Sequence, residues 1–449
     1  MGRLFGTDGV RGKAGEYPLD VPTVRRLGAG LARVLAQGSG GPIRILSGLD
    51  TRESGPWIER ELAYGLATGG ATLVSIGVIP TPAVAYLTPA RGFTAGVVIS
   101  ASHNPFGDNG IKVFAGTGEK FTEALENRVE AMMFDPSLVM PEGEAGPVES
   151  LDLRSEYIAH LRRILPPDLK PAGRIAIDCA NGATTTVAPR LFAELGIDAR
   201  AIGCEPDGRN INLHCGSTAP QDLAKLVVDG GYRLGVAFDG DGDRAIFVDA
   251  QGRIVDGDAV MLMCAKQMKD DGRLKRSSVV ATVMSNIGLE IALRDAGIAT
   301  VRCAVGDKYV MEEMQKSDLS LGGEQSGHII FSEHLFTGDG LGTALYVLRT
   351  IAESGRELGD LASDLTTFPQ VLVNVRVRER ANLKDIPAIA ALMADVESKL
   401  EGHGRLLVRY SGTEPLLRVM LEGRDQAEIT RWAHEIAAAV TSHLGEGSK

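Results

Sequence analysis

The densest group of side chains capable of chemistry is the run Asp239-Gly-Asp-Gly-Asp-Arg244, which directly follows the apolar segment 234–238. Three carboxylates at every second position can turn inward around one cation, and the intervening glycines allow the tight backbone that this needs. Oxygen ligands with open positions suit Mg²⁺ beside a phosphate. A calcium EF-hand is excluded because Arg244 and Ala250 stand where its loop needs Gly and Glu. An acidic surface turn is the remaining alternative.

A second group is Ser100-Ala-Ser-His-Asn-Pro105, which follows the apolar segment 95–99. A serine at the carboxyl end of a strand, with His and Asn beside it, could be an exposed nucleophile in an α/β crevice. Taken alone, the same residues are also typical of a capped turn. Lys112 follows closely and could supply a proton or pair with a phosphate.

The third group is Gly323-Glu-Gln-Ser-Gly-His328, again after an apolar stretch. Glu324 and Ser326 could bond sugar hydroxyls, and His328 could act as an acid or base near neutral pH. An ordinary loop histidine with satisfied hydrogen bonds is an equal interpretation of His328.

The fourth group is Arg409-Tyr-Ser-Gly-Thr-Glu-Pro415, together with Arg418. Ser411, Thr413 and the Gly412 amide can surround a phosphate while the two arginines add forked, charge-assisted hydrogen bonds. The alternative is a hairpin loop with solvated arginines.

Arg11 lies between glycines in Gly6-Thr-Asp-Gly-Val-Arg-Gly12, a close-packed loop that could approach a ligand. Gly28-Ala-Gly30 is not a dinucleotide signal, because Arg33 replaces its third glycine and the glycines lie inside a predicted helix. No Walker A sequence occurs.

These loops need elements to position them, and one arrangement appears three times. A β-branched run ends in a polar turn and a helical pattern follows, starting at Ile43, Ile175 and Val279. This predicts three related α/β domains with mixed, mostly parallel sheets. The last eighty residues predict a smaller C-terminal α+β domain behind a hinge near 366–369. The predicted domains are 1–155, 156–255, 256–367 and 368–449.

Composition limits the classes of function. The chain has 449 residues and a net charge of −11, which argues against a broad nucleic-acid surface. The five cysteines form no CxxC pair, so neither a disulfide framework nor a zinc site is expected. No apolar run approaches the length of a membrane span. We therefore expect a cytoplasmic protein that contacts neither membrane nor nucleic acid.

The four groups, in this order and spread over nearly the whole chain, resemble the α-D-phosphohexomutase family. The resemblance implies four domains with the active site in a central cleft. Within the family, Phe5-Gly-Thr-Asp-Gly-Val-Arg-Gly12 and the serine and Gly-Glu-Gln loops most resemble members that act on glucosamine phosphate. Members that act on mannose or glucose phosphate more often carry Met at the position of Gln325.

The resemblance also implies residue roles. Ser102 matches the phosphoserine, which completes a Mg²⁺ site with Asp239, Asp241 and Asp243. The residues near the reacting hydroxyl would be Arg11, His103, Lys112 and His328, with the proton acceptor left open among Arg11, Lys112 and His328. The substrate-binding residues would be Arg244, Gly306, Asp307, Lys308, Glu324, Ser326, Arg409, Ser411, Gly412, Thr413 and Arg418. Close relatives usually have Arg at the position of Lys308, and Lys keeps the charge but loses the fork.

The implied reaction converts glucosamine 6-phosphate into glucosamine 1-phosphate through glucosamine 1,6-bisphosphate, an activating intermediate, and feeds cell-wall precursor synthesis. Three alternatives are the same chemistry on mannose or glucose phosphate, a phosphosugar sensor without catalysis, and a phosphatase acting through phosphoserine. The resemblance further suggests a homodimer.

Overall fold

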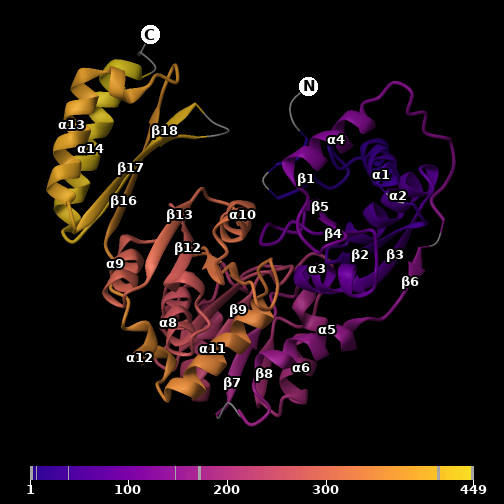
Figure 1. Ribbon diagram of the computed structural model, residues 1–449, viewed down its shortest axis with the longest axis horizontal. Coiled ribbons are helices and arrows are strands. Elements are labelled where there is room, and N and C mark those ends of the chain that lie inside the picture. Colours follow the sequence, from indigo (N-terminus) through magenta and orange to yellow (C-terminus); the bar gives the residue numbers. More distant parts are fainter. Residues whose placement is uncertain are drawn as a thin grey trace. The chain divides into compact units, whose positions relative to one another are not determined.

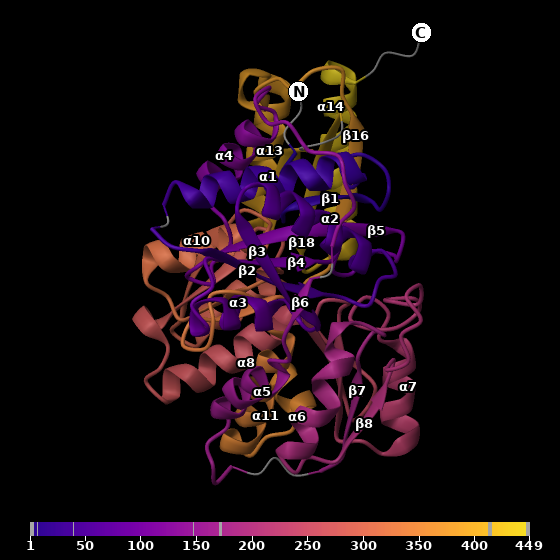
Figure 2. The same ribbon diagram turned by 90° about the vertical axis from the view of Figure 1, so that its right-hand side faces the viewer.

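Figures 1 and 2 show the computed structural model of the chain, which describes residues 4–6, 8–38, 40–146, 148–169, 173–411 and 415–445. The described strands form four sheets that follow one another along the chain. By compactness the chain divides into two units, one of residues 1–284 and 296–364 and the other of residues 285–295 and 365–449. Within the described residues, no helix has the length and apolar character needed to cross a membrane.

The first sheet has the strand order β1-β5-β4-β2-β3-β6. In both views α1 and α2 lie over one face of this sheet and α3 over the other (Figures 1 and 2). Gly28 is a helical residue, as the sequence predicts, and a Cβ there would lie 2.4 Å from the Leu62 carbonyl oxygen of the neighbouring helix. The elements of this part are β1 (Val10–Lys13), α1 (Val21–Ala36), β2 (Ile43–Leu49), α2 (Gly55–Thr68), β3 (Ala71–Val78), α3 (Thr81–Ala90), β4 (Ala95–Ile99), β5 (Asp108–Ala115), α4 (Glu123–Met133) and β6 (Glu149–Ser150).

The second sheet has the order β11-β10-β9-β7-β8 and follows a linking helix, α5, with a short 3₁₀ turn, η1. The elements of this part are α5 (Arg154–Leu161), η1 (Arg162–Ile164), β7 (Ile175–Asp178), η2 (Ala183–Thr186), α6 (Ala188–Glu194), β8 (Ala199–Ile202), α7 (Gln221–Gly230), β9 (Leu234–Phe238), β10 (Ala245–Asp249) and β11 (Ile254–Val255).

The third sheet has the order β13-β12-β14-β15. The elements of this part are α8 (Gly257–Asp270), η3 (Lys275–Ser277), β12 (Ser278–Thr282), β13 (Ala299–Cys303), α10 (Asp307–Ser317), β14 (Leu321–Gly323), β15 (Ile329–Phe331), α11 (Gly340–Ser354) and α12 (Leu358–Ala362).

The three sheets share one arrangement of four strands. Three parallel strands lie side by side and a fourth pairs antiparallel at one edge, in the orders β5-β4-β2-β3, β10-β9-β7-β8 and β15-β14-β12-β13. The structure therefore confirms three related α/β parts with mixed, mostly parallel sheets. In each part the last parallel strand and the antiparallel strand are joined by a loop. Those three loops contain Ser102, the triad Asp239–Asp243, and the pair Glu324 and Ser326.

The second unit is a three-stranded antiparallel sheet, β16-β18-β17, with α13 and α14 over one of its faces (Figure 1). Asp425 caps α14 by accepting from the backbone amides of Ala427 and Glu428 at 2.8 and 3.0 Å. The elements of this unit are α9 (Ile287–Asp295), β16 (Gln370–Arg376), η4 (Leu383–Asp385), α13 (Pro387–Leu400), β17 (Gly404–Tyr410), β18 (Leu416–Gly423) and α14 (Gln426–Leu444).

The four domain boundaries stay predictions, but one segment groups differently from what they imply. Residues 285–295 belong by compactness to the second unit, although the sequence places them within 256–367. The Asn286 amide donates to the Phe368 carbonyl oxygen at 3.0 Å, and its side-chain oxygen accepts from the Phe368 amide at 3.0 Å. A reciprocal pair of hydrogen bonds across 82 residues leaves no short-range signal in the sequence.

Candidate active site

Ser102 lies in the loop between β4 and β5 and is almost fully buried. Its backbone has φ 53°, in the left-handed region that non-glycine residues rarely adopt. Its hydroxyl donates to the Asp239 carboxylate, with 2.5 Å between Oγ and Oδ2. Backbone strain of this kind is typical of functional loops whose surroundings enforce the conformation.

Two side chains that the sequence did not single out hold this loop. Arg52 is buried and donates to the backbone oxygens of Ser102 and Asn104 at 3.0 and 2.8 Å. It also donates to the carboxylate of Asp50 at 2.8 Å. Asn212, from the second α/β part, donates to the same Ser102 oxygen at 2.9 Å. The Ser102 loop is therefore fixed from two parts of the chain.

The three aspartates meet as the sequence predicts. Asp239, Asp241 and Asp243 are buried, and one carboxylate oxygen from each lies within 4.8 Å of the others. Gly240 permits this approach because a Cβ there would lie 2.5 Å from the Ser102 carbonyl oxygen. Gly242 has φ 73°. The glycines thus let the acidic loop and the serine loop touch.

The donor set fits a divalent cation. The Oδ1 atoms of Asp241 and Asp243 are buried and have no hydrogen-bond partner among the described residues. The other Asp241 oxygen accepts from Thr81 Oγ1 at 2.6 Å and from Lys112 Nζ at 2.8 Å. Buried carboxylate oxygens without partners are costly unless a cation is bound, so the site is suited to a hard metal ion.

Burial and neighbouring charges shift the pKa values of two triad members in opposite directions. Burial raises the pKa of Asp239 well above its usual range, and Asp243 and Asp241 add to the rise. For Asp243, burial also acts upward, but Lys112 and then His328 outweigh it and hold its pKa well below the usual range. A cluster whose members differ in this way is typical of functional sites.

Lys112 extends from β5 into the acidic cluster and is 1% exposed. Besides Asp241, it contacts Asp243 at 3.4 Å and Asp8 at 3.0 Å. Burial lowers the pKa of a lysine, but Asp241, Asp8 and Asp243 raise that of Lys112 well above its ordinary value. Lys112 is therefore an ammonium cation at neutral pH. Arg11 pairs with Asp8, which the sequence did not identify as part of the site.

The two predicted histidines contact different members of the site, His103 the serine and His328 the triad. His103 Nδ1 is 3.4 Å from the hydroxyl oxygen of Ser102, and burial, helped by Arg244 and Arg11, lowers its pKa to about 4. His328 is buried, accepts from the Gly338 amide at 3.1 Å and lies 3.7 Å from the Asp243 carboxylate. Burial lowers the pKa of His328, but Asp243 overcomes this and raises it.

A cavity of about 400 Å³ is lined by Asp243 and Arg244 of the acidic loop and by the loop of the third α/β part, whereas Ser102, His103, Lys112 and His328 are not among its lining residues. Glu324 lines it and accepts from the Gly306 amide at 3.0 Å, while Ser326 Oγ is buried without a hydrogen-bond partner among the described residues. The lining residues are Leu4, Gly6, Asp8, Gly9, Arg11, Asp243, Arg244, Val305, Gly306, Asp307 and Glu324. The structure thus brings predicted residues from three separate loops to one cavity.

Lys308, one of the predicted substrate-binding residues, takes part in a buried ion pair. It does not line the cavity, and its ammonium donates to the Glu126 carboxylate at 3.1 Å, with both residues buried. Its neighbour Asp307 does line the cavity and pairs with Lys120. Lys308 therefore links α10 to α4 in this structure.

Three of the predicted phosphate-binding residues of the second unit, Arg409, Ser411 and Arg418, lie on or directly beside β17 and β18. Arg409 and Arg418 stand directly opposite each other on β17 and β18. Like charges facing each other on a sheet are unfavourable unless an anion offsets them. Ser411 follows β17, and its carbonyl oxygen accepts from Arg380, an arginine that the sequence did not indicate, at 2.6 Å. Gly412 and Thr413 lie outside the described residues.

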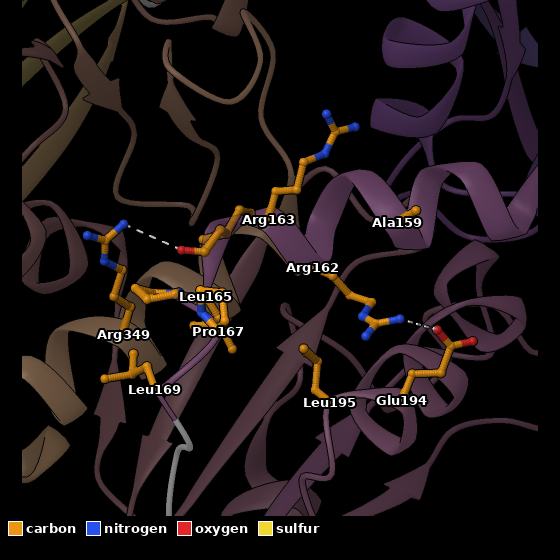
Figure 3. A pocket seen from close by; sticks show the side chains of 11 residues that line it. Ala159, Arg162, Arg163, Leu165, Pro167, Leu169, Glu194, Leu195 and Arg349 are labelled. Carbon is orange, nitrogen blue, oxygen red and sulfur yellow. Dashed lines mark hydrogen bonds and ion pairs between the residues drawn. The ribbon is translucent and has the colours of Figure 1, made fainter.

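A larger cavity, about 690 Å³, lies elsewhere, beside α5 and η1 (Figure 3). Arg162 points to Glu194, with 3.3 Å between their charged groups, and Arg349 donates to the Ile164 carbonyl oxygen at 3.4 Å. None of the predicted site residues lines this cavity, so the size of a cavity alone does not mark the functional site here.

Taken together, repeated α/β parts that carry a strained serine and an acidic triad, with a hairpin of two facing arginines in the second unit, are typical of a phosphosugar-handling class of enzyme. Four family models match the chain: the phosphoglucomutase/phosphomannomutase alpha/beta/alpha domains I, II and III over residues 2–139, 155–252 and 256–368, and the C-terminal domain over residues 372–439. The chain belongs to this family, the α-D-phosphohexomutases.

Relatives that match over their full length also support this family. The chain is 47% identical over 454 residues to the phosphoglucosamine mutase of Geotalea daltonii, covering 100% of each chain. It is 49% identical over 445 residues to that of Solibacter usitatus, covering 99% of each.

Solved structures show the same fold. A phosphoglucomutase/phosphomannomutase family protein from Burkholderia thailandensis has a TM-score of 0.80 at 23% identity, covering 98% of this chain and 97% of its own. The Aspergillus fumigatus N-acetylphosphoglucosamine mutase, solved with GlcNAc-6P and magnesium, has a TM-score of 0.69 at 19% identity, covering 98% and 95%.

Proposed function

We propose that this chain is an isomerase that interconverts glucosamine 6-phosphate and glucosamine 1-phosphate through phosphorylated Ser102. The contact between Ser102 Oγ and the buried Asp239 carboxylate carries the proposal, because it joins the nucleophile to a cluster suited to a cation. The glucosamine substrate rests on the full-length relatives of 47% and 49% identity that are named phosphoglucosamine mutases.

In the proposed reaction, the phosphoryl group on Ser102 Oγ passes to the free hydroxyl of the bound sugar phosphate. The P–O bond to Ser102 breaks, a new P–O bond forms at the sugar, and the proton that the hydroxyl loses ends on Ser102 Oγ. Arg11 and Lys112 are already cations, so of the three predicted acceptors His328 is the one that would relay this proton. The product of this half-reaction is glucosamine 1,6-bisphosphate. After it turns over in the site, its other phosphoryl group returns to Ser102 and glucosamine 1-phosphate remains.

The residues of the chain supply position and charge. Asp239, Asp241 and Asp243, with an oxygen of phosphorylated Ser102, would hold Mg²⁺, which when bound neutralises phosphoryl oxygens during in-line transfer. Glu324 and Ser326 would hold the sugar hydroxyls. Arg244, Gly306 and Asp307 line the same cavity, where they can contact the substrate.

Five residues of the second unit complete the proposal. Arg409 and Arg418 would bind the phosphate that is not being transferred, with Ser411, Gly412 and Thr413 donating hydrogen bonds. The predicted homodimer and the cytoplasmic location stay predictions.

The test is a coupled assay with glucosamine 6-phosphate, Mg²⁺ and a trace of 1,6-bisphosphate. We expect Ser102→Ala to lower the rate by at least about a thousandfold, since the phosphoryl acceptor is lost. Ser155→Ala, an exposed Ser-to-Ala change, should keep the wild-type rate. Normal turnover by folded Ser102→Ala protein would disprove the mechanism.

Parallel assays separate the alternatives. Preference for mannose or glucose phosphate would keep the mechanism and change the substrate. Release of free phosphate faster than isomer formation would indicate a phosphatase. Binding of all three sugar phosphates without turnover, by protein carrying phosphorylated Ser102, would indicate a sensor.

A further inference from the structure

Asp8 lines the active-site cavity, and its carboxylate contacts three cationic side chains. Its Oδ2 forms an ion pair with Lys112 Nζ at 3.0 Å and accepts from Arg11, and its Oδ1 accepts from Lys120 at 2.5 Å. Asp8 lies in the loop before β1 and belongs to none of the groups assigned a role above.

Lys112 contacts both Asp8 and two aspartates of the triad. Its ammonium contacts Asp241 at 2.8 Å and Asp243 at 3.4 Å, the two aspartates whose other oxygens have no hydrogen-bond partner among the described residues. An ammonium on these carboxylates competes with a divalent cation for the same negative charge. The competition is strong because all three groups are buried, where charges interact through a low dielectric.

A cation can enter the triad at low cost only if Lys112 has another acceptor. A buried ammonium that loses its carboxylate partners is strongly destabilised. Asp8 is the one carboxylate outside the triad that contacts Lys112 among the described residues.

Asp8 is itself anchored through its second carboxylate oxygen, Oδ1. Lys120 bonds Asp8 on one side and Asp307, at the start of α10, on the other. With Oδ1 fixed in this way, Oδ2 offers Lys112 an acceptor in a constant place.

We propose that Asp8 is a positioning residue that retains Lys112 while the triad binds its divalent cation. This inference rests on the metal site of the proposed function. It concerns how Lys112 and the cation share one acidic cluster, and it assigns Asp8 no contact with the reacting atoms.

The test is a double-mutant cycle read by Mn²⁺ affinity, measured by calorimetry on the full-length protein stripped of divalent ions. The four proteins are the wild type, Asp8→Asn, Lys112→Met and the double variant. We expect Asp8→Asn to weaken Mn²⁺ binding about tenfold in the wild type, because Lys112 then keeps hold of the triad. In the Lys112→Met background the same change should alter the affinity by less than about twofold.

The cycle distinguishes this role from a general effect of charge. Equal weakening in both backgrounds would show that Asp8 acts only through its own negative charge and would overturn the proposal. Asp318→Asn, which removes an exposed carboxylate paired with Lys275 at 2.7 Å, is the matched control and should leave the affinity unchanged. Asp8→Ser repeats the cycle if Asp8→Asn does not fold. Failure of the wild type to bind Mn²⁺ would overturn the proposed metal site and this inference together.

Discussion

At the scale of single residues, Arg52 shows how much of the site depends on a side chain outside the predicted site residues. Its guanidinium is 0% exposed and meets the Asp50 carboxylate, and it also donates to backbone oxygens of the Ser102 loop, including Asp108 at 2.9 Å. Several buried oxygens share one cation, so the strained conformation of Ser102 depends on a fork of donors in fixed directions.

We therefore expect Arg52→Lys to lower both the stability and the activity of the protein, although it preserves the charge. A single ammonium cannot reach all these oxygens, and the buried carbonyls left without donors should lower the free energy of unfolding by about 3 kcal/mol. Displacement of Ser102 should lower kcat about a hundredfold. Urea unfolding and steady-state kinetics measure both effects. Arg431→Lys, at an exposed position, is the control, and an Arg52→Lys protein within about 0.5 kcal/mol of wild type would contradict the argument.

At the scale of elements, three aromatic rings join α3, α5 and the segment after β15. Tyr86 stacks on His160 with 3.8 Å between ring centroids, and His160 stacks on His334 at 4.2 Å. His334 in turn lies 3.0 Å from Asp339, which caps α11. Burial, with His334 acting in the same direction, lowers the pKa of His160 to about 4.

This stack predicts a loss of stability in mild acid. The folded protein binds the His160 proton less readily than the unfolded chain, whose ordinary value is 6.5, so stability falls as pH drops from about 6.5 toward 4. The ring is only partly buried, so we expect a loss of about 1 kcal/mol between pH 7 and pH 5. His160→Phe keeps the stacking and removes the proton, so its unfolding free energy should fall less over this range.

The control for this titration is His434→Phe, at an exposed position on α14. It should lose stability with pH as the wild type does. If His160→Phe also follows the wild-type curve, the stacked histidine is not the group that titrates.

The elements also show which parts of the site can be predicted from sequence. Asp239, Ser102 and Glu324 were found because each follows an apolar strand in a short polar loop, which is a local signal. The sequence predicts one polar loop for each domain, but it does not predict that each loop joins the last parallel strand to the antiparallel strand, because that place depends on strand pairing rather than on residue type. Asp8 and Arg52 were missed for a related reason: their roles come from partners up to 112 and 56 residues away.

At the scale of the whole molecule, the chain carries more than one hydrophobic core. One cluster of buried side chains lies entirely within residues 375–444, on the strands and helices of the second unit. Another lies within residues 4–133. Separate cores without shared members allow separate cooperative unfolding, as expected for a chain of this length.

We therefore expect calorimetry to show that the second unit unfolds in its own transition. Ile436→Ala removes a fully buried side chain from α14, at a cost of about 2–5 kcal/mol. For a unit of this size, such a change should lower one transition by more than about 8 °C and leave the other in place. Ile45→Ala, from the core of the first sheet, should do the reverse. If either substitution moved both transitions together, the two units would unfold as one cooperative body. The hairpin that carries Arg409 and Arg418 could then move only when the whole fold opens.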